Sequence, residues 1–168
     1  FRYCSHTCTD ERLEIVLQSD LLRAVCRFEA FGGVIRVRTE YRNISARELV
    51  LTEASSFLLP CLGASGRREA EQMYLWRFVQ SHHAECQPRK NSFYSYGFSS
   101  ETACGQKRIA MANVGSWSTK EALPQGIVEG ADGCIMFQIE SNNSWYYEIS
   151  DTGGQYYLYL GGANEPFG

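Results

Sequence analysis

The sequence predicts an all-β protein, built as a large antiparallel sandwich of two stacked sheets. Three observations predict this fold class: a two-residue alternation from Val34 to Arg42, aromatic-rich strand patterns between Cys134 and Leu160, and a near absence of helix signals. About a dozen strand-like segments fit into 168 residues, and a chain of that size needs only one core. We therefore expect a single domain over residues 1–168.

The N-terminal third predicts a strand meander. Leu13–Ser19 and Leu21–Phe28 flank a turn at Ser19-Asp20. In Val34–Arg42, four charged residues alternate with apolar or hydroxyl residues, which predicts a half-buried strand. We expect its charged face to be solvated and to form cross-strand ion pairs. A further strand, Leu49–Leu59, is expected to end at Pro60.

The middle of the chain predicts a loop and then shorter strands. The loop is Gly63–Arg68, and the strand-like segments are Met73–Gln80, Ala84–Gln87, Phe93–Phe98 and Arg108–Val114. The best helix candidate is Ser118–Leu123, in which Ser118 could cap and Pro124 would end the helix after about one turn.

The C-terminal region predicts three consecutive strands, Cys134–Glu140, Trp145–Ser150 and Tyr156–Leu160, joined by the turn-forming segments 141–144 and 151–154. Successive side chains of a strand point to opposite faces. Adjacent aromatic residues, such as Tyr146 and Tyr147, therefore place rings on both faces of this meander. Such strands have two surfaces to cover.

Composition narrows the range of partners and compartments. A net charge of -3 gives no basic field for nucleic acid, and no apolar run approaches the ~20 residues of a membrane helix. Phe1–Cys4 does not resemble a signal peptide, and the missing initiator Met suggests a piece of a longer polypeptide. Seven cysteines form no regular disulfide framework, so we expect a reducing, cytoplasmic location.

Catalytic and metal signals are weak. Cys4 and Cys8 form one close pair, but only His82-His83 could serve as a second, so we expect no metal and no cofactor. Neither a nucleophile elbow nor a phosphate-binding glycine loop occurs. Carboxylates such as Glu140 and Glu148 could form a glycosidase pair, although spacing alone does not pair them.

Aromatic and amide side chains favour sugar binding, because a ring stacks on the apolar face of a pyranose while amides bond its hydroxyls. Tryptophans in a sandwich usually belong to the core, and Trp117 is the expected exception because its segment, Val114–Glu129, is typical of a loop. The candidate site residues for a sugar pocket or an interface loop are Trp117, Ser118, Gln125, Asn143 and Trp145.

Several motifs, taken in order, are similar to one known family. They are Arg108-Ile109-Ala110, Gly115-Ser116-Trp117-Ser118, Gln138-Ile139-Glu140, Asn143-Ser144-Trp145 and Leu160-Gly161-Gly162. Together with the opening strands, they resemble the N-terminal domain of bacterial α-galactosidases of glycoside hydrolase family thirty-six, over nearly the whole chain.

This resemblance implies a β-supersandwich of the galactose-mutarotase-like type that precedes a (β/α)₈ barrel. The barrel carries the two catalytic aspartates, so the resemblance assigns no catalytic residue to this chain and implies a sandwich cut at both ends. The implied partners are the barrel of the same polypeptide, α-galactosides and further copies in a homo-oligomer. Two alternatives remain open: a free-standing carbohydrate-binding module, and a small glycosidase that uses Glu140 and Glu148.

Overall fold

The computed structural model confirms the all-β class. It describes residues 1–64, 66–98, 108–151 and 154–163, which form three antiparallel sheets of four strands each. One six-residue α-helix and one short 3₁₀-helix complete the described part. No helix in these ranges has the length and hydropathy needed to cross a membrane.

The chain divides into two compact units, Phe1–Phe57 and Leu58–Gly168. The boundary falls inside strand β5 (Glu53–Ala64), which therefore belongs to both units. The single domain expected over residues 1–168 stays a prediction, because a continuous strand crosses this boundary.

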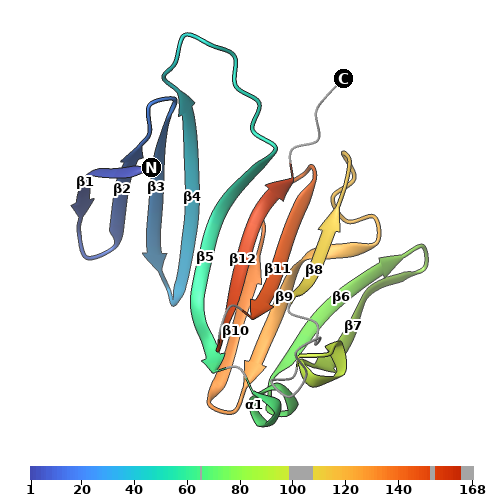
Figure 1. Cartoon of the computed structure of the whole chain (residues 1–168). Helices are drawn as coiled ribbons and strands as arrows, with labels where there is room; N and C mark the ends of the chain where they lie inside the picture. The colour runs from blue at the N-terminus through green and yellow to red at the C-terminus, as the bar shows by residue number, and fades with distance from the viewer. Residues whose placement is uncertain (65, 99–107, 152–153, 164–168) are drawn as a thin grey trace. The chain divides into compact units, whose positions relative to one another are not determined.

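The first unit is a four-stranded meander in the order β1-β2-β3-β4 (Figure 1). Its strands are β1 (Arg2–Cys8), β2 (Arg12–Gln18), β3 (Leu22–Phe31) and β4 (Val34–Asn43). The turn expected at Ser19-Asp20 joins β2 to β3, and Ser19 closes it by accepting the backbone N–H of Leu22 at 3.0 Å. Gly32 and Gly33 join β3 to β4 with φ values of 55° and 82°, a backbone conformation that favours glycine.

The charged face predicted for β4 is confirmed. Arg27 on β3 lies between two carboxylates and binds Glu14 on β2 at 2.8 Å and Glu40 on β4 at 2.9 Å. The hydrogen bond from Arg27 lowers the pKa of Glu40. On the other face of β4, Thr39 and Tyr41 donate hydrogen bonds to the backbone carbonyls of Ser56 and Ser55.

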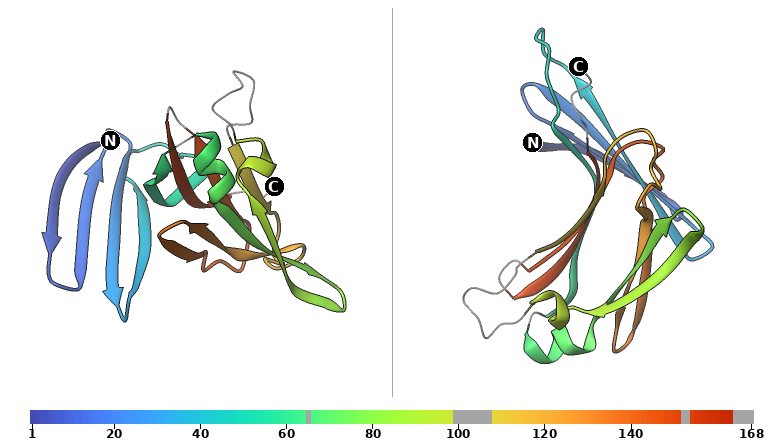
Figure 2. Two further views of the ribbon diagram at one scale, coloured as in Figure 1. Left: turned by 90° about the horizontal axis from the view of Figure 1, so that it is seen from below. Right: turned by 90° about the vertical axis from the view of Figure 1, so that its right-hand side faces the viewer.

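The second unit contains two sheets that form separate layers (Figure 2). We call the order β10-β9-β6-β7 the β6 sheet and the order β5-β12-β11-β8 the β11 sheet. The remaining elements are α1 (Arg67–Gln72), β6 (Tyr74–Ser81), β7 (Ala84–Ser92), η1 (Tyr94–Tyr96), β8 (Arg108–Asn113), β9 (Ala122–Gly130), β10 (Gly133–Gln138), β11 (Trp145–Asp151) and β12 (Gln155–Ala163).

Aromatic side chains fill the space between these layers. Trp145, Tyr147 and Ile149 alternate along β11 and are buried. Phe137 on β10 meets the ring of Tyr147 edge-on, with centroids 5.0 Å apart. On the opposite face of the β11 sheet, the rings of Tyr146 and Tyr159 meet at 5.7 Å. The prediction that these strands carry rings on both faces is therefore confirmed.

Two edge strands contain a proline. The strand expected to end at Pro60 continues to Ala64, and β7 runs beyond the expected Gln87 through Pro88. Both strands lie at the edge of their sheets. Proline lacks the N–H that a central strand needs, but an edge strand has one side without a partner.

The predicted C-terminal meander is wrong at its first connector. Strands β10 and β11 lie in different sheets, whereas β11 and β12 form the expected hairpin. The actual partner of β10 is β9, from which it is separated by a turn at Ala131-Asp132. Residues 141–144 therefore carry the chain from one layer to the other, although their composition suits a hairpin turn.

The expected helix, loop and strand in the middle of the chain also differ from the structure. Residues 118–121 form turns rather than a helix, and β9 begins at Ala122. Pro124 lies beside a register shift between β6 and β9, where its missing N–H costs little. The actual helix, α1, covers part of the expected loop and gains an Arg67–Glu71 ion pair at 3.0 Å. The expected strand Phe93–Phe98 contains the 3₁₀-helix η1.

Candidate functional site

The best-defined candidate site is the loop of residues 114–121 between β8 and β9, which we call the Trp117 loop. The β8–β11 pairing places Asn113 directly opposite Trp145. Asn113 is buried, and its amide donates to the backbone carbonyl of Trp117 at 2.9 Å. The indole N–H of Trp145 donates to the carbonyl of Ser118 at 2.5 Å. Two buried side chains on neighbouring strands thus hold adjacent carbonyls of the loop.

The connector 141–144 braces the start of this loop. The hydroxyl of Ser144 accepts the backbone N–H of Gly115 at 2.9 Å. Gly115 has a φ of +104°, a backbone conformation that residues other than glycine rarely adopt. Asn143 is exposed, and its backbone N–H donates to Ser141 Oγ at 3.2 Å. Segments almost thirty residues apart in the chain therefore form one cluster.

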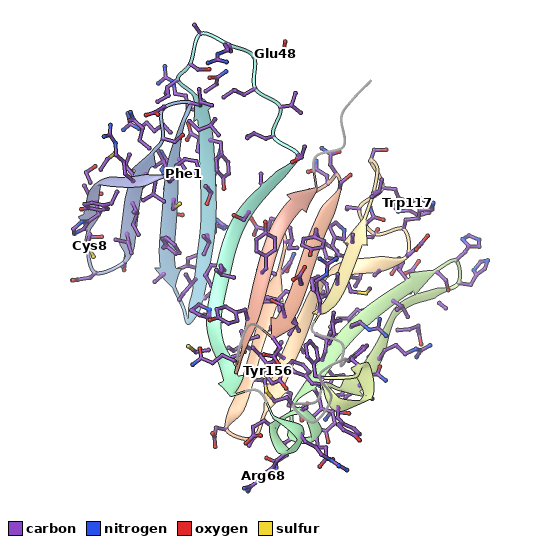
Figure 3. All side chains as sticks on the ribbon, in the orientation of Figure 1. Phe1, Cys8, Glu48, Arg68, Trp117 and Tyr156 are labelled. Carbon is purple, nitrogen blue, oxygen red and sulfur yellow. The ribbon has the colours of Figure 1, made fainter. Side chains whose placement is uncertain are left out.

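Trp117 is the exposed member of this cluster. Its side chain is 65% exposed, whereas Trp145 is fully buried. Figure 3 shows Trp117 at one end of the second unit, while Tyr156 lies toward the other end. The prediction that Trp117 lies outside the core is confirmed. The loop therefore presents an indole ring to solvent, while hydrogen bonds from buried side chains hold the backbone that carries this ring.

The structure assigns the five predicted site residues to different places. The indole N–H of Trp145 donates directly to the carbonyl of Ser118, whereas the carbonyl of Trp117 is bound by Asn113. Asn143 belongs to the connector that braces the same loop. Gln125 lies on β9 opposite Gln138 of β10. Its neighbour Gly126 is buried in the core, so Gln125 faces the outer side of the β6 sheet. Trp145 is an anchor of the loop rather than an exposed surface.

A second cluster covers the outer face of the β6 sheet and was missed in the sequence. Glu129 on β9 accepts the indole N–H of Trp76 at 2.6 Å and the ammonium of Lys90 at 2.8 Å. Both hydrogen bonds lower the pKa of Glu129, and the bond from Lys90 has the larger effect. Lys90 also lies 4.2 Å from the ring centre of Tyr74 and 5.0 Å from that of Trp76. The period-two spacing of Tyr74, Trp76 and Phe78 was the available signal.

This second cluster is a structural contact network. A lysine that lies over two rings occupies the surface on which a sugar would stack. The carboxylate of Glu129 already accepts one hydrogen bond on each of its two oxygens. Among the three tryptophans, Trp117 therefore offers the most open ring.

The remaining chemical candidates give no assembled centre. Glu148 accepts a hydrogen bond from the hydroxyl of Tyr146 and lies 3.3 Å from Arg108, so its carboxylate is engaged in an ion pair. Within the described ranges, no three His, Cys, Asp or Glu side chains gather closely enough to hold a metal ion. Cys4 and Cys8 are exposed on β1.

Comparison with known proteins adds no relative: no family model, curated protein or solved structure matches the chain.

Proposed function

We propose that this chain is the non-catalytic N-terminal β-sandwich domain of an α-galactosidase-like glycoside hydrolase. In this proposal the domain packs on a catalytic barrel of the same polypeptide, supports a homo-oligomer and lends the Trp117 loop to the sugar pocket. The barrel supplies the catalytic carboxylates. The motif resemblance motivates the assignment, and the all-β sandwich agrees with it.

The observation that carries the proposal is the combination of an exposed ring and a fixed backbone. The side chain of Trp117 is 65% exposed. Its backbone carbonyl nevertheless accepts a hydrogen bond from Asn113, and the next carbonyl, that of Ser118, accepts one from Trp145. An exposed tryptophan without a function would not require two buried side chains to hold the backbone of its loop. A ring held in this way loses little conformational freedom when it stacks on a sugar.

The coding sequence on both sides of this segment is the first test. A downstream (β/α)₈ barrel with two suitably placed aspartates would support the proposal. A start codon directly before Phe1 and a stop codon directly after Gly168 would refute it, because the implied barrel would be missing from the polypeptide.

A second test separates the proposal from a free-standing carbohydrate-binding module. The 168-residue chain is titrated with methyl α-galactoside by calorimetry, and its turnover of a chromogenic α-galactoside is measured. We expect neither measurable binding nor turnover, because the pocket needs the barrel. Binding that Trp117→Ala abolishes would favour the binding module, and turnover that Glu148→Gln abolishes would favour the small glycosidase. Trp76→Ala serves as the control for a general loss of an aromatic side chain.

In the full-length enzyme, Trp117→Ala is expected to raise the KM for galactosides while the protein still folds and oligomerises. Unchanged kinetics would remove the Trp117 loop from the sugar pocket.

A further inference from the structure

Arg77 places a positive charge between the two layers of the second unit. It lies on β6, next to the central strand β9, with Gly126 as its partner on β9 and Arg89 as its partner on β7. Leu75, two residues earlier on the same face, is fully buried. The Arg77 side chain therefore points toward the core side of the β6 sheet.

Among the residues that the structure describes, the groups around the Arg77 guanidinium carry no negative charge. Its Nη1 lies 3.5 Å from the sulfur of Met111 on β8, and its carbon lies 5.3 Å from the ring centre of Tyr96. Its Nε is buried and has no hydrogen-bond partner in the described part of the chain. Burial raises the pKa of Tyr147, and the nearby charge of Arg77 opposes this rise.

Arg89 adds a second positive charge on the same face. It stands directly opposite Arg77, and its own Nη1 donates to the carbonyl of Pro88 at 3.3 Å. Like charges in this position destabilise a sheet. In the described ranges, neither arginine has a carboxylate within ion-pair distance. Within the described part of the chain, the pair therefore lacks the counter-charge that a partly desolvated guanidinium needs.

Further hydrogen-bonding groups share this face of the β6–β7 hairpin. Asn91 lies two residues beyond Arg89 on β7, and its amide oxygen is 3.5 Å from the hydroxyl of Tyr96. The planar fork of an arginine binds the two oxygens of a carboxylate or a phosphate in parallel. Two such forks, one partly buried and one exposed, lie on the same face of the hairpin as an amide and a phenol and make a donor-rich cluster.

We propose that Arg77 and Arg89, together with Asn91 and Tyr96, form a binding site for an oxyanion, that is, a carboxylate or phosphate group. The buried Nε of Arg77 and the exposed guanidinium of Arg89 are its two main donors. A neutral galactoside is not the ligand of this site, so the inference is independent of the proposed function. Anion binding by the chain itself is the property that tests this inference.

The same chain contains a matched control. Arg23 and Arg42 also stand directly opposite each other, on β3 and β4, but both are exposed. Exposed charges remain hydrated and gain little from a bound anion. Any general response of arginine pairs to anions will therefore appear in Arg23→Gln as well.

The test observes the orphan donor itself. In the ¹⁵N-labelled 168-residue chain, the Nε–Hε cross-peak of Arg77 is identified by its absence in Arg77→Lys. Inorganic phosphate or acetate is then added against sodium chloride of equal ionic strength. We expect a saturable shift with one of these anions. Saturation by acetate alone identifies a carboxylate ligand, and saturation by phosphate alone identifies a phosphate ester.

Two variants decide whether the response is specific. Arg89→Gln should weaken the apparent affinity about tenfold, because one charge-assisted bond is lost, and Arg23→Gln should leave it unchanged. Thermal unfolding gives an independent readout: the anion should raise the midpoint more than chloride does in the wild type, and less so in Arg89→Gln. A shift that only follows ionic strength, or one that Arg89→Gln does not alter, would overturn the proposal.

Discussion

Trp145→Phe is the most informative perturbation of the candidate site. The indole is fully buried against Tyr147, with parallel rings 5.9 Å apart, and it anchors the carbonyl of Ser118. Phenylalanine keeps an aromatic ring on β11 but cannot donate a hydrogen bond. The substitution therefore tests packing and loop anchoring at one position.

The expected loss of stability has two parts. Phenylalanine has about three fewer heavy atoms than tryptophan, and at ~0.8 kcal/mol for each buried CH₂-sized group this removes about 2.5 kcal/mol. Leaving the carbonyl of half-buried Ser118 without its donor costs about 1 kcal/mol more, because water can partly replace the indole. The sum, about 3–4 kcal/mol, is a large share of the ~5–15 kcal/mol that stabilises a typical domain.

Urea unfolding followed by far-UV circular dichroism measures this loss without relying on tryptophan emission. With an m-value of about 2 kcal/mol/M, the midpoint should fall by roughly 1.5–2 M. Trp117→Phe is the matched control, because its ring is 65% exposed and the change should stay within about 0.5 kcal/mol. Equal midpoints for Trp145→Phe and Trp117→Phe would show that Trp145 neither fills the core nor anchors the loop.

Three further predictions concern the second unit. Gly126→Ala should cost about 1–3 kcal/mol in urea unfolding, since an added Cβ would lie 2.6 Å from the Phe137 ring; Gly130→Ala, with no atom nearer than 3.9 Å, should cost clearly less, and equal costs would contradict the steric argument. Glu129→Gln should lower the unfolding midpoint at neutral pH. The folded-state pKa of Glu129 is depressed, so its contribution is present above the unfolded pKa and is lost as the pH falls through the folded value; a gap between variant and wild type that stays constant down to about pH 3 would refute this. Burial raises the pKa of Tyr147, so in a spectrophotometric titration Tyr147→Phe should remove a phenol that ionises only when the chain unfolds at alkaline pH, not one that titrates with exposed tyrosines.

Local sequence patterns correctly predicted the elements whose environment depends only on which face of their own strand or loop each side chain occupies. The alternation in β4 predicted both its strand and its charged face, because a half-buried strand needs only period two. The double aromatic pattern of β11 and β12 predicted rings on both faces for the same reason. The exposure of Trp117 also followed from its local setting among glycine, serine and threonine.

Predictions failed where the result depends on partners far away in the chain. Pro60 and Pro88 are tolerated because β5 and β7 became edge strands, and edge position is a property of the sheet. Residues 141–144 have hairpin composition but connect two layers, because Phe137 on one sheet and Tyr147 on the other pack edge to face between the layers. Helix propensity near Ser118 was too short to compete with the pairing of β9.

The sequence by itself thus determined the all-β class, most strand positions and the exposed tryptophan, because each depends on neighbours within a few residues. Only the tertiary structure decided which strands share a sheet, that Trp145 and Asn113 hold the Trp117 loop, and that Arg77 stands opposite Arg89 with no carboxylate of the described residues at ion-pair distance. These features arise from hydrogen-bond register and packing between segments far apart in the chain, by 27 residues for Ser118 and Trp145 and by 53 for Trp76 and Glu129. A one-dimensional pattern records the character of each side chain but not the partner that it meets.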